Sequence, residues 1–296
     1  MKLILLFISV LSLMSSVIGN IGNILHLTDV HYDQFYKEGS SATCFIAEKV
    51  GLRCCRDYDI PISPYRKAGK WGDYDCDTPL DIIEYTLQNS VSQGFDYDYI
   101  FWTGDAASHH DLTQSFDINM KAVDTVTDII QKYYPNTTVI PVIGNHDTWP
   151  IDQLLPPFYN TTAVTKYLSK KWNMWIPEES MDTFYYGGYY SMKITDDLLF
   201  VVLNCLYEDD NNILDRKTPD PGHQNAWVKS VLKKAYDNKQ KVWIIGHIYP
   251  GAGESTDTFT NLMINLTRTY PDTITNQFFG HSHKDEFKLY RSEKNE

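Results

Sequence analysis

The sequence predicts an α/β fold in which layers of β-sheet are flanked by helices. Short apolar runs rich in β-branched and aromatic residues alternate with amphipathic helical patterns along most of the chain. Strands that alternate with helices at this spacing favour parallel pairing. The 296 residues, of which 43% are hydrophobic, suffice for a sizeable core, and no linker divides them.

The elements follow from these patterns in order. We expect strands at 24–28, 97–103, 138–143, 198–204 and 241–245, and a further run near Phe278. Helices are expected from Thr78-Pro79 to about Val91, over 116–134 and over 224–236. The segment 150–190, rich in Tyr, Trp, Pro and Asn, is expected to be a long excursion that shapes a substrate cleft.

The first residues have the pattern of a secretory signal peptide. Lys2 precedes an apolar run that ends at small residues near Gly19, so residues 1–19 are assigned to the signal and 20–296 to the mature chain. No later stretch approaches the roughly 20 apolar residues of a membrane helix. Three glycosylation sequons, at Asn136, Asn160 and Asn265, also favour export. We therefore expect a secreted glycoprotein, either extracellular or in the lysosomal or endosomal lumen, without a transmembrane anchor.

The charge balance restricts the class of partner. Lys and Arg total 26 against 38 Asp and Glu, a formal net charge of −12. Such a chain repels a phosphate polymer, so a nucleic-acid partner is excluded as a property of the whole chain. A small anionic substrate remains compatible if bound metal ions reverse the local sign.

Four of the five cysteines lie in one segment. Cys44, Cys54, Cys55 and Cys76 are expected to form two disulfides in an oxidising compartment, with the adjacent Cys54 and Cys55 bonded to different partners. A zinc site is the rival interpretation, but Cys-x₂-Cys spacing and a nearby His are lacking. Cys205 is expected to be a buried free thiol.

Residues of metal-ligand type follow the predicted strands. They are Asp29-Val30-His31, Gly104-Asp105 with Ser108-His109, Gly144-Asn145-His146-Asp147, Gly246-His247 and Gly280-His281-Ser282-His283. Ligands of α/β sheets bind at the carboxyl ends of strands, so these loops are expected to converge. The Asp-x-His and His-x-His spacings would direct both side chains to one face of an extended strand. The preceding glycines suit turns in which backbone approaches a ligand closely.

This ordered set resembles the calcineurin-like metallophosphoesterases, and more narrowly the acid sphingomyelinase-like phosphodiesterases. The resemblance spans about 24–287 and includes His109, the cysteine cluster, Asn145-His146-Asp147-Thr148-Trp149-Pro150 and Phe278-Phe279-Gly280-His281. It implies two zinc ions per chain: Asp29, His31 and His283 on the first, Asn145, His247 and His281 on the second, and Asp105 bridging both. His109 and His146 would orient the phosphoryl group and protonate the leaving alkoxide. Ser108 stands where purple acid phosphatases carry an iron-binding Tyr, which favours zinc.

The remaining histidines receive structural interpretations. His26 is expected in the first strand with a core or supporting role, His110 on a loop surface and His223 in a helix cap.

The expected function is a secreted zinc-dependent phosphodiesterase that hydrolyses sphingomyelin to ceramide and phosphocholine, with peripheral contact to lipid. Two alternatives are kept. The absence of a saposin-like domain before Ile24 favours nucleotides or CDP-choline as substrates. Family members also continue well beyond the His-x-His pair, whereas this chain ends at Glu296. We therefore expect a catalytic domain that lacks its C-terminal part, and an inactive metal-binding homologue is the other alternative.

Overall fold

The computed structural model describes residues 22–44, 53–63, 65–110, 113–157, 163–216 and 218–290. The expected signal peptide, residues 1–19, and the sequon at Asn160 lie outside these ranges. Among the helices that are described, none has the length and apolar character needed to cross a membrane.

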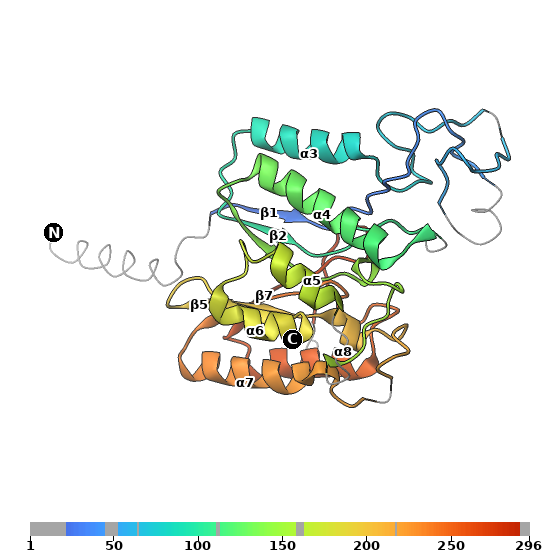
Figure 1. The fold of residues 1–296 in the computed structure, drawn as a ribbon. Helices are drawn as coiled ribbons and strands as arrows, with labels where there is room; N and C mark the ends of the chain where they lie inside the picture. Colours follow the sequence, from blue (N-terminus) through green and yellow to red (C-terminus); the bar gives the residue numbers. More distant parts are fainter. Residues whose placement is uncertain are drawn as a thin grey trace, which may run out of the picture.

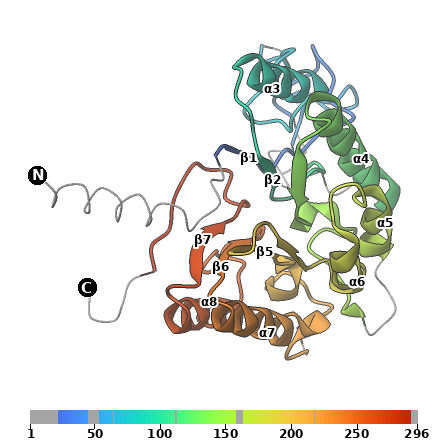
Figure 2. The ribbon, with the colours of Figure 1, turned by 90° about the vertical axis from the view of Figure 1, so that its left-hand side faces the viewer.

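Two β-sheets form the centre of the molecule (Figures 1 and 2). The first contains β1 (Ile24–Leu27), β2 (Tyr99–Trp102) and β3 (Thr138–Pro141), all parallel. The second has the order β4 (Tyr190–Lys193), β5 (Leu198–Val202), β6 (Lys241–Ile245) and β7 (Ile274–Phe278). The predicted parallel pairing is confirmed for β5, β6 and β7, but β4 pairs antiparallel with β5. The short connection 194–197 explains this, because a parallel pair needs a long crossover.

Aromatic side chains join the two sheets. The ring centroid of Phe101 on β2 lies 5.2 Å from that of Phe200 on β5 and 5.0 Å from that of Phe278 on β7. Phe101 and Phe200 are fully buried. Truncation of such a residue leaves a cavity and costs about 3–5 kcal/mol. This contact therefore fixes the carboxyl ends of both sheets relative to each other.

Helices cover the outer faces of both sheets, which confirms the predicted layered α/β architecture. α3 (Leu80–Ser92) and α4 (Phe116–Tyr133) lie over the first sheet, whereas α7 (Gln224–Asp237) and α8 (Asp257–Thr269) lie over the second (Figures 1 and 2). Two of these helices begin at a side-chain cap. The hydroxyl of Ser115 accepts the N–H of Ile118 in α4, and that of Thr256 accepts the N–H of Phe259 in α8.

The segment 150–190, expected to be a long excursion, is partly helical and packs on the core. It contains α5 (Ala163–Lys171) and α6 (Glu178–Gly187). Trp172, Trp175 and Phe184 belong to the core, whereas Tyr185 and Tyr186 are exposed. Trp172 is fully buried, 5.4 Å from Trp102 of β2 between ring centroids. Part of the aromatic content of this segment therefore reflects packing against the first sheet.

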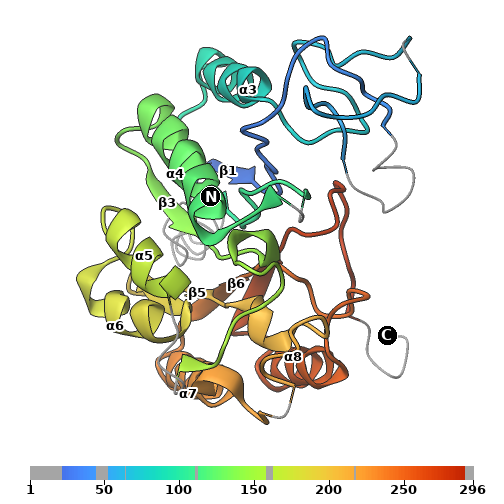
Figure 3. The same ribbon diagram turned by 45° about the vertical axis from the view of Figure 1, so that its right-hand side comes forward.

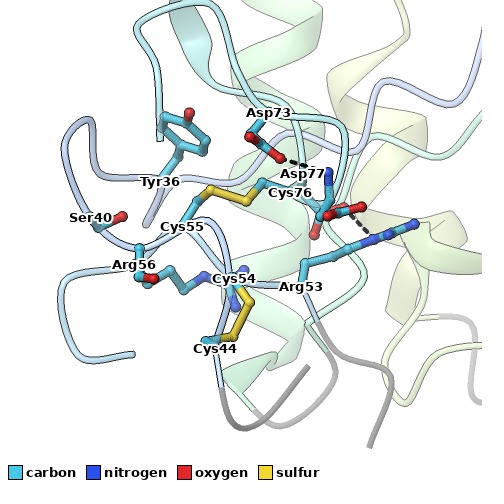
Figure 4. Close-up of a disulfide and its surroundings, with 12 residues drawn as sticks. Tyr36, Ser40, Cys44, Arg53, Cys54, Cys55, Arg56, Asp73, Cys76 and Asp77 are labelled. Carbon is cyan, nitrogen blue, oxygen red and sulfur yellow. Dashed lines mark hydrogen bonds and ion pairs between the residues drawn. A yellow bond between two sulfur atoms is a disulfide. The ribbon is translucent and has the colours of Figure 1, made fainter. Parts of the chain in front are cut away.

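The segment that contains Cys44, Cys54, Cys55 and Cys76, the disulfide-linked loop, lies beside the N-terminal end of α3 (Figure 3). Disulfides join Cys44 to Cys54 and Cys55 to Cys76, so the adjacent cysteines bond to different partners as predicted (Figure 4). Cys205 is a buried free thiol, also as predicted.

Candidate metal centre

The seven residues predicted as ligands lie in one place. Asp29, His31, Asp105 and His283 form a first group, in which one ligand-type atom of each residue lies within 4.8 Å of those of the others. Asp105, His247 and His281 form a second group by the same measure. Asn145 joins the second group, because its Oδ1 lies 2.9 Å from His247 Nε2 and 3.2 Å from His281 Nδ1. Side chains 252 positions apart in the sequence are in direct contact, since the Nε2 atoms of His31 and His283 are 3.0 Å apart.

Asp105 is shared by the two groups. Its Oδ2 lies 3.5 Å from His31 Nε2 in the first group and 3.2 Å from His247 Nε2 in the second. Its Oδ1 accepts the backbone N–H of His146 at 2.8 Å. The carboxylate is almost fully buried, at 1% exposed. A single carboxylate oxygen, Oδ2, therefore faces ligand-type nitrogen atoms of both groups.

The backbone at these residues is not extended, contrary to the expectation for the Asp-x-His and His-x-His pairs. Asp29, His31, Asp105, His281 and His283 all have positive φ, between 44° and 72°. The left-handed region costs an L-residue roughly 1–2 kcal/mol. Cross-loop hydrogen bonds hold this backbone in place: the N–H groups of Asp29 and His31 donate to the carbonyls of Gly104 and Asp105 at 3.1 and 3.0 Å. Backbone strain of this kind concentrates at functional sites.

Two glycines permit the close approach of neighbouring loops. A Cβ on Gly144 would lie 2.2 Å from Asp105 Oδ1, and one on Gly280 would lie 2.7 Å from Asp29 Oδ2. Any larger residue would therefore displace a carboxylate of the site.

Backbone carbonyls orient two of the imidazoles. Nδ1 of His31 lies 2.9 Å from the carbonyl oxygen of Ala107, and Nδ1 of His247 lies 2.6 Å from that of Thr103. If Nδ1 carries the proton in each ring, Nε2 presents its lone pair to the centre. A fixed tautomer of this kind is characteristic of metal-binding histidines. The donor set thus fits divalent cations that take nitrogen and oxygen ligands.

The carboxylates set the protonation of the metal-free site. Burial favours neutral His247, but Asp105 and Asp29 outweigh it and raise the pKa of this imidazole to about 10. Burial likewise opposes ionisation of Asp29, yet contacts with His283 and His247 lower its pKa to about 2. A cation that binds here must therefore displace a proton from His247.

His109 and His146 lie beside the first group. The His109 ring stacks on His31 with 3.7 Å between centroids, and it lies 4.7 Å from the His146 ring. The His109 side chain is 23% exposed, so a substrate could reach it. Sequence reasoning missed its partner, Asp77, whose Oδ1 lies 2.6 Å from His109 Nδ1.

Asp147 has a supporting role that the sequence analysis did not assign. Its buried carboxylate accepts backbone N–H groups from Gly144, Asp105 and Ala106 at 2.8, 3.0 and 2.8 Å. It therefore ties the loop after β3 to the loop after β2. Burial and the nearby Asp105 raise its pKa to about 7.

The other histidines stand apart from the centre. His110 is buried, at 1% exposed, so the expected surface position is wrong. Its Nδ1 lies 3.0 Å from the Thr113 hydroxyl. His26, on β1, contacts the Thr103 hydroxyl through Nε2 at 2.9 Å. His223 is the N-cap residue of α7, as predicted, although its side chain does not form the capping hydrogen bond.

Helices flank the two sheets, and the loops at the strand ends bring Asp, Asn and His side chains together in a double cluster. This combination of fold and site defines a metallophosphoesterase. The chain belongs to the calcineurin-like phosphoesterase family, whose model matches residues 22–285.

Several known proteins resemble the chain. It is 33% identical over 279 residues to sphingomyelin phosphodiesterase B of Dictyostelium discoideum and to human sphingomyelin phosphodiesterase, covering 92% of this chain and 42% and 43% of those proteins. It is 31% identical over 284 residues to human cyclic GMP-AMP phosphodiesterase SMPDL3A, covering 93% of this chain and 60% of that protein. The chain thus spans about half the length of these relatives. A dimetal phosphatase from Danio rerio shares the fold, with a TM-score of 0.52 and 13% identity over 90% of this chain and 82% of that one.

Proposed function

We propose that this chain is a zinc-dependent phosphodiesterase that hydrolyses sphingomyelin to ceramide and phosphocholine. The observation that carries the proposal is the double cluster that shares Asp105, with His109 and His146 at its side. The sphingomyelin phosphodiesterases among its relatives support the substrate class.

In this proposal, seven residues hold two zinc ions. Asp29, His31 and His283 bind the first, Asn145, His247 and His281 bind the second, and Asp105 binds both. The chemistry that such a pair supplies when bound is polarisation of the phosphoryl oxygens and activation of a water for in-line attack. The positive charge also explains how a chain of net charge −12 accommodates an anionic substrate.

His109 is assigned as the general acid. With Nδ1 donating to Asp77, the protonated ring has its second N–H, at Nε2, to transfer to the leaving oxygen as the P–O bond breaks. Stacking against His31 places this ring at the edge of the cluster. His146, whose backbone N–H contacts Asp105, is assigned to orient the phosphoryl group.

A nucleotide phosphodiesterase is the second candidate, and the same residues would serve it. The relative human cyclic GMP-AMP phosphodiesterase SMPDL3A favours this alternative. CDP-choline would combine a nucleotide with the choline group of sphingomyelin, so it is a useful third substrate.

Secretion and contact with lipid are part of the proposal. The two disulfides support an oxidising compartment, extracellular or in the lysosomal or endosomal lumen. The sequon residues Asn136 and Asn265 are exposed, as glycosylation requires. On the disulfide-linked loop, Trp71 and Tyr74 expose 52% and 102% of their surface, which suits peripheral contact with lipid.

The test is hydrolysis by the purified full chain with a matched inactive variant. Sphingomyelin in detergent micelles, CDP-choline and a cyclic dinucleotide are assayed after chelation and after zinc is restored. We expect zinc-dependent release of phosphocholine that Asp105→Asn abolishes, whereas preferred turnover of the cyclic dinucleotide would establish the second candidate. A folded chain that retains less than about one zinc ion and cleaves none of these would overturn both and leave the inactive homologue.

A further inference from the structure

The two groups of candidate ligands differ in charge. Beside the shared Asp105, the first group has a carboxylate of its own, Asp29. The second group has only Asn145, His247 and His281, which are neutral when they bind a cation. On these ligands alone, the second site would attract a dication less strongly than the first.

Two carboxylates contact the second group from outside. Asp152 Oδ1 accepts a hydrogen bond from Asn145 Nδ2 at 2.8 Å, and the other end of that amide, Oδ1, faces His247 and His281. Glu254 Oε2 lies 3.2 Å from His281 Nε2, and the opposite ring nitrogen, Nδ1, faces Asn145. Each carboxylate therefore orients its partner so that the ligating atom points into the centre.

Backbone contacts hold both carboxylates in place. Asp152 adopts a left-handed conformation with φ of 63°, and its N–H donates to the carbonyl of Asn145 at 3.1 Å. Although the Glu254 side chain is 46% exposed, its carbonyl accepts the N–H of Asp210 at 2.7 Å. Burial raises the pKa of the neighbouring Asp209 carboxyl to about 7, and the charges of Asp152 and Glu254 add to this effect.

We propose that Asp152 and Glu254 are positioning residues of the second metal site, and that they supply the negative charge that its own ligands lack. The inference rests on the proposed function, because it concerns the same pair of cations. Carboxylates behind a metal ligand raise its basicity and fix its orientation. Both sites would then bind their ions with more nearly equal affinity.

The experiment is calorimetric titration of zinc into metal-free protein, without substrate. Asp152→Asn and Glu254→Gln remove one charge each and retain an oxygen that can accept the hydrogen bond. We expect the weaker of two binding steps to lose about 10- to 100-fold in affinity, while the tighter step is unchanged. Asp210→Asn is the matched control, because this exposed residue lies in the same acidic region and its carboxylate has no described contact with a ligand.

The outcomes separate the two proposals. Wild-type protein that binds only one ion would overturn both the two-zinc scheme and this inference. Two ions in the wild type, with unchanged affinities in Asp152→Asn and Glu254→Gln, would overturn this inference alone. Equal weakening by Asp210→Asn would show that the effect is general electrostatics and would also overturn it. Since Glu254 is half-exposed, its variant tests the inference even if Asp152→Asn does not fold.

Discussion

The carboxylate of Asp77 holds His109 at two points. Its Oδ1 lies 2.6 Å from the ring Nδ1, and its Oδ2 accepts the backbone N–H of the same residue at 2.9 Å. Asp77 is buried, with its side chain 2% exposed, and it directly follows Cys76 of the second disulfide. Asp77 thus connects the loop that the Cys55–Cys76 disulfide holds to the candidate general acid, His109.

Loss of the Asp77 charge should lower kcat more than it raises KM. Asp77→Asn removes the carboxylate that contacts Nδ1 of His109 and orients this ring, and general acid catalysis is worth about 10²- to 10⁴-fold. We expect a decrease in kcat of about 10- to 100-fold on sphingomyelin. The measurement is steady-state kinetics with zinc at saturation.

A substrate with a good leaving group provides the control. A nitrophenyl diester needs little protonation of its leaving oxygen, so Asp77→Asn should impair its hydrolysis much less. An equal defect on both substrates would contradict the assignment of His109 as the acid. The double variant with His109→Ala should be no worse than His109→Ala alone, because the two residues act as a unit.

The two disulfides should differ in their effect on activity but not on stability. They join residues 10 and 21 positions apart, and the chain-entropy model gives each about 3 kcal/mol. Replacing Cys55 and Cys76 by Ser loosens the residue before Asp77, whereas replacing Cys44 and Cys54 does not. We therefore expect a larger loss of kcat in the first pair at a similar loss of unfolding free energy. Equal kcat in both pairs would show that Asp77 is held independently of its disulfide.

Asp147 should be essential for stability. Asp147→Ala leaves three backbone N–H groups without their acceptor, and each unsatisfied buried donor costs about 1–3 kcal/mol. We expect urea unfolding to show a loss of at least about 3 kcal/mol. Asp182→Ala, at an exposed position of α6, should change stability by less than about 0.5 kcal/mol. Similar values for both variants would mean that water replaces the lost carboxylate.

The sequence predicted the meeting of the seven ligand-type residues because strand ends have a simple geometry. Parallel strands deliver their carboxyl-end loops to one edge, so the order of Asp29, Asp105 and Asn145 along the chain sufficed. His247 and His281 follow the second sheet, and the Phe101 contacts bring that edge against the first. The left-handed backbone of these residues, by contrast, follows from loop contacts between distant segments.

The supporting residues could not be found in the same way. Asp77, Asp152 and Glu254 lie in loops away from strand ends, and nothing in their neighbours' spacing points to a ligand. The surface position expected for His110 is wrong as well, and the ring of Tyr58, which is distant in sequence, lies 6.4 Å from its ring between centroids. Such contacts depend on tertiary structure alone.

Glu208 should make the free energy of unfolding depend on pH, and the substitution Glu208→Gln should remove this dependence. Burial raises the pKa of this carboxyl from its ordinary value of 4.5 to about 7. The folded chain therefore holds a proton that the unfolded chain releases between these values, and this contribution to stability is lost as the pH rises through them. Glu208→Gln, which stays neutral, should match the wild type at about pH 5 and exceed it by roughly 2–3 kcal/mol at about pH 8.

Urea unfolding of metal-free wild type and variant across this range measures the contribution of Glu208 together with its effect on Asp215, whose pKa the Glu208 charge helps to raise. The imidazole of His247 titrates equally in both proteins, so it cancels in the difference between them. Glu178→Gln, at an exposed position in the first turn of α6, should leave the difference flat. A Glu208→Gln variant that is less stable than wild type at every pH would contradict the sign. It would mean that the ionised carboxylate contributes more through Thr256, whose hydroxyl lies 3.2 Å away, than its burial costs.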